Sequence, residues 1–278
     1  MARRAPRPTR HRRKVGVRRA VLAGLAAFGL TGSAVVVSGL LAPAGAATGA
    51  WPEAKGDDIP VARTIEVTGT YDGGLRRFHG TGALGSAGQD EDQDPVFVLK
   101  DGAVLKNVVL GSPAADGVHC LGSCTIQNVW WEDVGEDAAT FKGTSPQAVY
   151  TVYGGGARKA SDKVFQFNGA GKLVVTRFQA AGIGKLVRTC GNCKKQYQRT
   201  VIVNDVDITA PAQSIVGVNA DYGDTAALRE IRIHGDPRQK IKPCTRFQGN
   251  TTGEEPTELG TGPDGTTCRY TDADLFYE

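Results

Sequence analysis

Amphipathic helices are absent from this 278-residue sequence after Ala47, which excludes folds that alternate strands and helices. Aromatic residues are only 7% of the chain, and no basic stripe is interleaved with them, which argues against nucleic-acid binding. Glycine is abundant, with 37 residues, but it follows no collagen period. It accompanies runs rich in Val and Ile, which excludes wholesale disorder.

The first 50 residues contain no acidic residue but nine Lys or Arg. The other 24 basic residues face all 29 acidic ones, which leaves a net charge of about −5 on the rest of the chain. Basic residues up to Arg19, the apolar run Val21 to Leu41 and the small residues Ala44-Gly45-Ala46 follow in the order of a secretory signal peptide.

Residues 1–46 are therefore predicted to be a signal peptide, and the mature chain to be secreted without stable membrane association. An uncleaved anchor is the alternative, because the apolar run could span a bilayer, although its many Gly, Ala and Ser residues make it a weak one. Arg18-Arg19 leaves the export route open between the general and the twin-arginine pathways.

All six cysteines follow the predicted cleavage site, and an even number in an exported chain favours disulfides. Six cysteines allow 15 pairings, of which nearest neighbours suggest Cys120 with Cys124, Cys190 with Cys193, and Cys244 with Cys268. The alternative is that Cys190-Gly191-Asn192-Cys193 is half of a zinc site or a redox pair. No second ligand pair and no helix signal accompany it.

Short apolar runs recur at intervals of about two dozen residues, each rich in β-branched residues and bounded by Gly, Asp, Asn or Pro. One set is centred on Phe97, Val118, Ala139, Val164, Leu186 and Val216, and a second set covers 105–108, 126–129, 149–152, 174–177, 203–206 and 228–231. A sandwich or barrel would instead pair neighbouring strands through tight hairpins. Similar motifs returning in the same order predict an all-β parallel β-helix.

We expect one domain over residues 47–278, with a core of about 56–249 and a loop-rich cap, 250–278, tied down by Cys244 and Cys268. Stacked asparagines such as Asn107 and Asn128 suit the turn ladders of this fold. We expect the protein to be a monomer.

Acidic residues recur in register with the first set of runs. Asp94, Asp116, Asp137 and Asp162 stand two or three residues before successive centres, and Glu136 adjoins Asp137. Because neighbouring strands lie about 4.8 Å apart, these carboxylates would stack and repel one another. Turns often contain a single Asp, but four in register predict a Ca²⁺ site, since Ca²⁺ takes oxygen ligands in flexible geometry. Zinc is disfavoured because the column offers no clustered His or Cys.

Basic residues follow the acidic ones on later rungs. Lys163 adjoins Asp162, Lys185 takes the corresponding place one rung later, and Arg188 comes three residues on. A cation beside these side chains makes a cleft for an anionic ligand, and a linear polyanion with carboxylates would bridge them. Trp130, Trp131 and Tyr153 could stack on sugars, or the tryptophans could belong to the core.

Four segments of the sequence closely resemble polysaccharide lyase family 3, the secreted pectate lyases. The similarity extends over roughly Gly56 to Gly249 and rests on the runs AADGVHC at 114–120, VWWEDVGEDA at 129–138, SDKVFQ at 161–166 and IGKLVR at 183–188. The resemblance implies a right-handed parallel β-helix and Ca²⁺-dependent cleavage of polygalacturonate, the de-esterified form of pectin.

The resemblance also implies roles for individual residues. Asp116, Glu136, Asp137 and Asp162 correspond to calcium ligands, and Glu91 matches a further acid near the substrate. Lys163 matches the catalytic base, with a pKa that we expect nearby cations to lower, while Lys185 and Arg188 match the basic pair that binds substrate and assists catalysis.

Two other functions stay open from the residues alone. A β-helical polygalacturonase would hydrolyse the chain with two carboxylic groups, which Asp116, Asp137 and Asp162 could supply. A non-catalytic solenoid that binds acidic polysaccharides would use the same groove. The adjoining lysines and arginine favour the lyase.

Overall fold

The structure, a computed structural model, describes residues 49–278 except positions 87, 90 and 91. The predicted signal peptide, residues 1–46, and Glu91 lie outside the described residues, so both stay predictions. The described residues belong to one compact unit, Gly45–Glu278. In this part of the chain no helix is long and apolar enough to cross a membrane.

Strands dominate the described chain, with single-turn 3₁₀ helices between some of them. The strands are β1 (Ile59–Val61), β2 (Ile65–Val67), β3 (Thr70–Gly80), β4 (Phe97–Leu99), β5 (Ala103–Leu110), β6 (Val118–Cys120), β7 (Cys124–Trp131), β8 (Ala139–Phe141), β9 (Val149–Arg158), β10 (Lys163–Phe167), β11 (Gly171–Thr189), β12 (Arg199–Asn219), β13 (Thr225–His234), β14 (Lys242–Gln248), β15 (Thr257–Thr261), β16 (Cys268–Arg269) and β17 (Leu275–Tyr277). The 3₁₀ helices are η1 (Gly82–Leu84), η2 (Ala220–Tyr222) and η3 (Asp272–Asp274).

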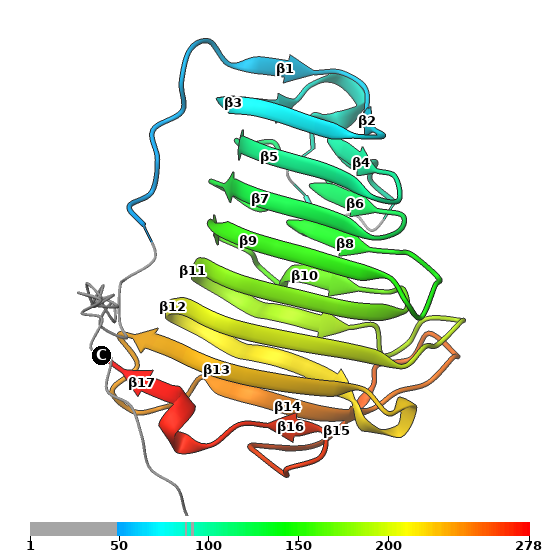
Figure 1. Cartoon of the computed structure of the whole chain (residues 1–278), viewed down its shortest axis with the longest axis vertical. Helices are drawn as coiled ribbons and strands as arrows, with labels where there is room; N and C mark the ends of the chain where they lie inside the picture. The colour runs from blue at the N-terminus through cyan, green and yellow to red at the C-terminus, as the bar shows by residue number, and fades with distance from the viewer. Residues whose placement is uncertain (1–48, 87, 90–91) are drawn as a thin grey trace, which may run out of the picture. The chain divides into compact units, whose positions relative to one another are not determined.

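The strands stack in parallel from rung to rung, except that β15 pairs antiparallel with β14 (Figure 1). One series of pairs runs through β3, β5, β7 and β9, and another through β4, β6, β8 and β10. The long strands β11 and β12 turn a corner and belong to both series: β11 pairs with β9 in its first half and with β10 in its second. This arrangement confirms the all-β parallel β-helix.

In the first set of runs, the predicted register is correct on the early rungs and wrong by one residue on two later ones. Phe97, Val118 and Ala139 align as expected. Ala139 then aligns with Phe165 and not with Val164, and Phe165 with Val187 and not with Leu186. Since all of these side chains are apolar and buried, the hydrophobic pattern alone does not distinguish the two registers. In the second set, Ile126 aligns with Val152 and not with Val149.

Aromatic side chains fill the middle of the solenoid. Trp131 is fully buried and makes edge contacts with Phe165 and Phe178, and Phe141 packs against Tyr150. Burying each such side chain stabilises the fold by about 1.5–3 kcal/mol. Trp131 is therefore a core residue and does not stack on a ligand.

One corner of the solenoid uses left-handed backbone on every rung. Asn107, Asn128, Arg177, Asp205 and Glu230 all have φ between +51° and +55°. The predicted asparagine ladder is confirmed: the Asn128 side-chain amide donates to the side-chain oxygen of Asn107 (2.8 Å), and Asn107 donates to Asp72 (3.0 Å). Asparagine suits the position because it tolerates this conformation and offers both a donor and an acceptor.

The three suggested disulfides are all present, Cys120–Cys124, Cys190–Cys193 and Cys244–Cys268. With Cys190 bonded to Cys193, the motif has no thiolate to offer zinc. A redox pair forms the same bond when it is oxidised, so the redox alternative stays a prediction. Cys244 and Cys268 join β14 to β16, so the last strands are held against β13 and β14. The proposed boundary between core and cap stays a prediction.

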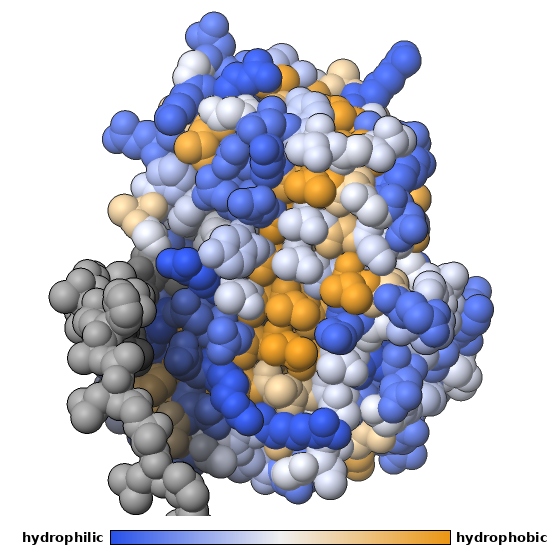
Figure 2. All heavy atoms as spheres, in the orientation of Figure 1, coloured by the Kyte–Doolittle hydropathy of each residue, from blue (hydrophilic) through white to orange (hydrophobic). Residues whose placement is uncertain are grey.

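Side chains on the outside are not evenly distributed. On the face seen in Figure 1, Figure 2 shows a central strip of apolar residues with hydrophilic residues on both sides of it. Outward residues of this sheet such as Val174 and Ile202 are aligned neighbours and only partly exposed. The acidic and basic site residues predicted from the sequence lie elsewhere, along the sheet of β6, β8 and β10.

We expect Asn128→Ala to lower the free energy of unfolding by about 1–3 kcal/mol, because it removes the ladder bonds to Asn107 and Trp130 and places alanine at φ +53°. Guanidinium unfolding measures the change. Asn128→Gly keeps the backbone relaxed and removes only the side-chain bonds, so it should cost less than Asn128→Ala. Equal stability of Asn128→Ala and the unaltered chain would contradict the role of this corner.

Candidate active site

The predicted site residues lie at the start of the rungs formed by β6, β8, β10 and the second half of β11. Lys163, the first residue of β10, is the direct register partner of Lys185 in β11. Asp116 and Asp137 each stand two residues before aligned positions, Val118 and Ala139. The structure thus brings acidic and basic groups from four rungs to one edge of the sheet.

Three carboxylates form a buried cluster. One oxygen from each of Asp116, Glu136 and Asp137 lies within 4.8 Å of the other two, and none of these residues is more than 4% exposed. Glycine makes this close stacking possible: a Cβ on Gly117 (φ +51°) would lie 2.2 Å from the Ala138 carbonyl oxygen. The tight turns of two rungs can therefore lie directly against each other.

Two oxygens of the cluster are not satisfied by hydrogen bonds. Asp116 Oδ1 and Asp137 Oδ1 are buried without a hydrogen bond in the described structure. Burial, together with the charges of Glu136 and Asp116, raises the pKa of Asp137 well above its ordinary value, although Lys163 opposes this. Orphaned oxygens in an all-carboxylate set fit a hard cation such as Ca²⁺.

Asp162 and Asp94 do not join this group. The Asp162 carboxylate lies between the two lysines, 2.8 Å from Lys163 Nζ and in contact with Lys185 Nζ. These contacts outweigh the effect of burial and lower the pKa of Asp162. The exposed Asp94 contributes a backbone carbonyl to the Asp116 amide. The predicted column of four aspartates was therefore wrong. The residue of β10 that aligns with Ala139 is Phe165, and the residue two places before it is Lys163, not Asp162.

Lys163 is buried among acids. Besides Asp162, its ammonium lies 3.4 Å from Glu136 Oε1 and 3.7 Å from Asp137 Oδ1. Burial alone would lower the pKa of Lys163, but the charge of Asp137 and the bond to Asp162 outweigh it and raise the pKa above its ordinary value. The expectation that nearby cations lower the pKa of Lys163 concerns the site with its cation bound and stays a prediction.

His119 and Lys142 are part of the site, although the sequence analysis gave them no role. His119 Nε2 lies 2.5 Å from Asp116 Oδ2, and Lys142 Nζ lies 3.2 Å from both ring nitrogens of His119. The spacing Asp116-x-x-His119 across a turn into a strand was the available signal, and Asp137-x-x-Thr140 repeats it one rung later, with Thr140 3.4 Å from Asp137.

Arg188 lies on the outward row of the same sheet, and its guanidinium is held by a network. Its Nη1 donates to the side-chain oxygen of Asn219 (3.0 Å), and Asp224 in turn accepts from Asn219. The guanidinium stacks 4.0 Å above the ring of Phe247, and Gly217 leaves room for this contact. Burial lowers the pKa of Arg188 to about 10, so the side chain stays charged at neutral pH.

Beyond Lys185 the site continues into a basic hollow of about 340 Å³. Lys240, Lys242 and Phe247 border it together with Ser214, and Lys242 Nζ pairs with Glu258 (3.0 Å). The edge of the sheet therefore changes from a carboxylate cluster to an array of cations. Such an edge matches a ligand with several negative charges.

Comparison with known proteins identifies the family. The pectate lyase family model matches residues 48–254. The chain belongs to the pectate lyase family. Among fungal pectate lyases, it is 42% identical to pectate lyase E of Emericella nidulans over 224 residues, which are 80% of this chain and 84% of that one. It is 44% identical to probable pectate lyase E of Neosartorya fischeri over 79% of this chain and 83% of that one.

Solved pectate lyase structures share the fold. The catalytic domain of pectate lyase PelI from Erwinia chrysanthemi superposes with a TM-score of 0.69 at 32% identity, covering 80% of this chain and all of that one. PelI in complex with tetragalacturonic acid gives a TM-score of 0.66 at 31% identity, over 80% of this chain and 71% of that one. These relatives confirm the family that the four sequence blocks resembled and make the protein a pectate lyase enzyme.

We expect Asp137→Asn to stabilise the pectate lyase in EDTA, because it removes one charge from the crowded cluster. The raised pKa fixes the sign: the gain is present at neutral pH and disappears as pH falls below 3.8, where Asp137 is protonated in both folded and unfolded chains. Calcium at about 100 times its dissociation constant should stabilise the unaltered chain by about 2.7 kcal/mol and the variant far less.

Thermal unfolding with and without calcium measures both effects. Asp133→Asn is the matched control, since Asp133 forms only an exposed pair with Lys159 in the described structure. A calcium response in Asp137→Asn as large as in the unaltered chain would remove Asp137 from the cation site.

Proposed function

We propose that this pectate lyase cleaves polygalacturonate by Ca²⁺-dependent β-elimination. The observation that carries the proposal is the contact of Lys163 with both the carboxylate cluster and Asp162. The proposed cation site therefore adjoins Lys163, a potential proton acceptor. Removing a proton from the carbon next to a carboxylate requires both groups close together.

The substrate assignment rests on charge and on the relatives. PelI was solved with tetragalacturonic acid, a chain of uronates. In this chain, Lys185, Lys240 and Lys242 border one continuous hollow that could receive successive carboxylates. Glu258, paired with Lys242, would have to give way to a substrate carboxylate.

Asp116, Glu136 and Asp137 would hold the calcium ion, and Asp162 is proposed as a further ligand beside them. When bound, Ca²⁺ would neutralise the substrate carboxylate and acidify the proton on the neighbouring carbon. Glu91 is proposed as an additional acid near the substrate on the strength of the family resemblance alone.

Lys163 would take the proton from C5 of the uronate. The electron pair of that C–H bond forms the C4–C5 double bond, the bond from C4 to the glycosidic oxygen breaks, and the leaving oxygen takes a proton from water. Lys163 must first lose its own proton, and with its carboxylate neighbours committed to a cation, its pKa would fall towards a useful value.

Arg188 and Lys185 would stabilise the negative charge that develops on the substrate carboxylate. In the described structure, Arg188 uses Nη1 for its bonds to Thr189 and Asn219. The anchored guanidinium is therefore oriented before substrate arrives, which is the condition for electrostatic stabilisation of a transition state.

A hydrolytic reaction is the second candidate from the residues. An inverting glycosidase separates its two carboxyl groups by about 6.5–9.5 Å to admit water. One oxygen from each of Asp116, Glu136 and Asp137 lies within 4.8 Å of the other two, which is closer than that arrangement. Asp162 is paired with Lys163 and Lys185 instead. The crowded cluster supports cation binding instead.

Secretion follows from the same proposal, because pectic polymers lie outside cells. We propose that residues 1–46 are removed as a signal peptide and that residues 47–278 act as a monomeric domain without stable membrane association. Three disulfides support an oxidising environment.

With polygalacturonate, the enzyme should release unsaturated ends that absorb in the ultraviolet, and a chelator should abolish this signal until calcium is restored. Highly methylated pectin should react more slowly, because esterification removes the charge that the cation neutralises. Reducing ends produced without ultraviolet absorbance would point to hydrolysis and overturn the proposal.

Lys163→Ala should keep polygalacturonate binding and lose turnover by about 10²–10⁴-fold, the usual contribution of a general base. Initial rates and equilibrium binding measure the two properties separately. Lys159→Ala is the matched control, because Lys159 is exposed and pairs only with Asp133 in the described structure. A Lys163→Ala enzyme with normal turnover would refute Lys163 as the base.

A further inference from the structure

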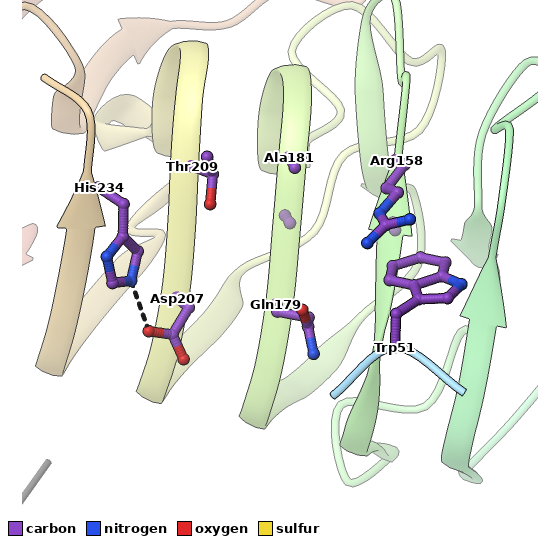
Figure 3. Close-up of a pocket in the computed structure, with 9 residues that line it drawn as sticks. Trp51, Arg158, Gln179, Ala181, Asp207, Thr209 and His234 are labelled. Atoms are coloured by element: carbon purple, nitrogen blue, oxygen red, sulfur yellow. Dashed lines mark hydrogen bonds and ion pairs between the residues drawn. The ribbon is translucent and has the colours of Figure 1, made fainter. Parts of the chain in front are cut away.

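A second cavity lies around the corner from the catalytic edge, on the sheet of β9, β11, β12 and β13. It has a volume of about 390 Å³, within the usual range for small-molecule sites. Figure 3 shows Trp51 and Arg158 at one end, Asp207 and His234 at the other, and Ala181 between them.

The register explains why the surface is hollow here. Arg158, Ala181, Thr209 and His234 are aligned on four successive rungs, about 14 Å from first to last at ~4.8 Å per rung. The short side chains of Ala181 and Thr209 leave an open floor between the two longer ones. Gly156 opens the adjacent row, where a Cβ would lie 3.0 Å from the Trp51 ring.

Arg158 is an available cation. Its guanidinium stacks 3.7 Å from the centre of the Trp51 ring, and it forms no ion pair with any residue in the described part of the chain. Stacking on an aromatic face leaves the in-plane N–H groups free to donate, and these match a carboxylate with two parallel bonds.

The acidic groups of the cavity are already satisfied. Asp207 accepts from Arg232 Nε (2.8 Å) and Nη2 (2.9 Å) and lies 2.7 Å from His234 Nε2. The second ring nitrogen of His234 lies 3.2 Å from Glu278. The charge without a protein partner is therefore the positive one of Arg158, which favours an anionic ligand.

The wall and floor suit a sugar ring. Trp51 is held in place by an edge contact with Trp130 (4.9 Å) and by a bond from Gln179 to the Gly49 carbonyl (2.6 Å). A fixed indole, the partly exposed Ala181 on the floor and the exposed Thr209 combine apolar surface with scattered polar groups. Sugars present the same combination of apolar ring faces and hydroxyls.

We propose that this cavity is a non-catalytic binding site for a uronate unit of an acidic oligosaccharide, with its carboxylate on Arg158. The choice of galacturonate over other acidic sugars rests on the proposed function. A site on a second sheet would hold the polymer near the enzyme while another stretch of it occupies the catalytic edge.

The test is a titration of the full chain with digalacturonate in EDTA, which prevents turnover, followed by NMR of the indole N–H signals. The chain has only three tryptophans, and Trp51→Phe assigns the signal of Trp51. We expect that signal to shift saturably, with affinity about ten-fold lower in Arg158→Ala, as loss of a charge-assisted bond predicts. Neutral digalactose should bind at least about ten-fold more weakly.

Arg177→Ala is the matched control, because Arg177 lies on the same sheet, near the ring of Tyr153 but outside the cavity. It should bind like the unaltered chain, and an unshifted Trp131 signal in each variant verifies the fold. An unresponsive Trp51, unchanged affinity in Arg158→Ala, or equal binding of digalactose would each overturn the proposal. Lyase activity on trigalacturonate is measured separately and should be unchanged in Arg158→Ala, so failure of the two proposals is distinguishable.

Discussion

The mutual repulsion of three buried carboxylates next to one lysine is the constraint on which the site depends. Asp116, Glu136 and Asp137 crowd together because tight turns at the start of successive rungs stack directly. Burial and the charges of Glu136 and Asp116 raise the pKa of Asp137, and the ammonium of Lys163 does not offset them. A bound divalent cation would reduce the repulsion among the carboxylates and at the same time weaken their hold on Lys163. Cation binding would therefore also lower the pKa of the base.

The solenoid makes this arrangement possible because successive rungs place different side chains at equivalent positions. Lys163 and Lys185 are register partners, and the aligned turns before them carry acids. Charges that are about two dozen residues apart in sequence are thus brought about 4.8 Å apart in space. The same register places Arg158 and His234 at the two ends of the second cavity, where small residues stand between them.

Periodicity, cysteine spacing and the asparagines at 107 and 128 were sufficient to predict the parallel β-helix, its disulfides and its turn ladder. They were not sufficient to predict the register of β10 and of the second half of β11. Val164 and Phe165, for example, are both apolar and both buried. That slip of one residue assigned Asp162 to the carboxylate column, when its side chain lies between two lysines. His119 was overlooked because its role depends on a contact across a turn, and Asn219 because it acts only through Arg188.

We propose that a calcium ion binds among Asp116, Glu136 and Asp137, close to Lys163. A crystal structure of the enzyme grown in calcium, with anomalous scattering data, tests it most directly. We predict one strong anomalous peak at about 2.3–2.6 Å from an oxygen of each of these three carboxylates. Full calcium-dependent activity in crystals whose only anomalous peaks lie away from the cluster would show that these carboxylates do not hold the catalytic calcium.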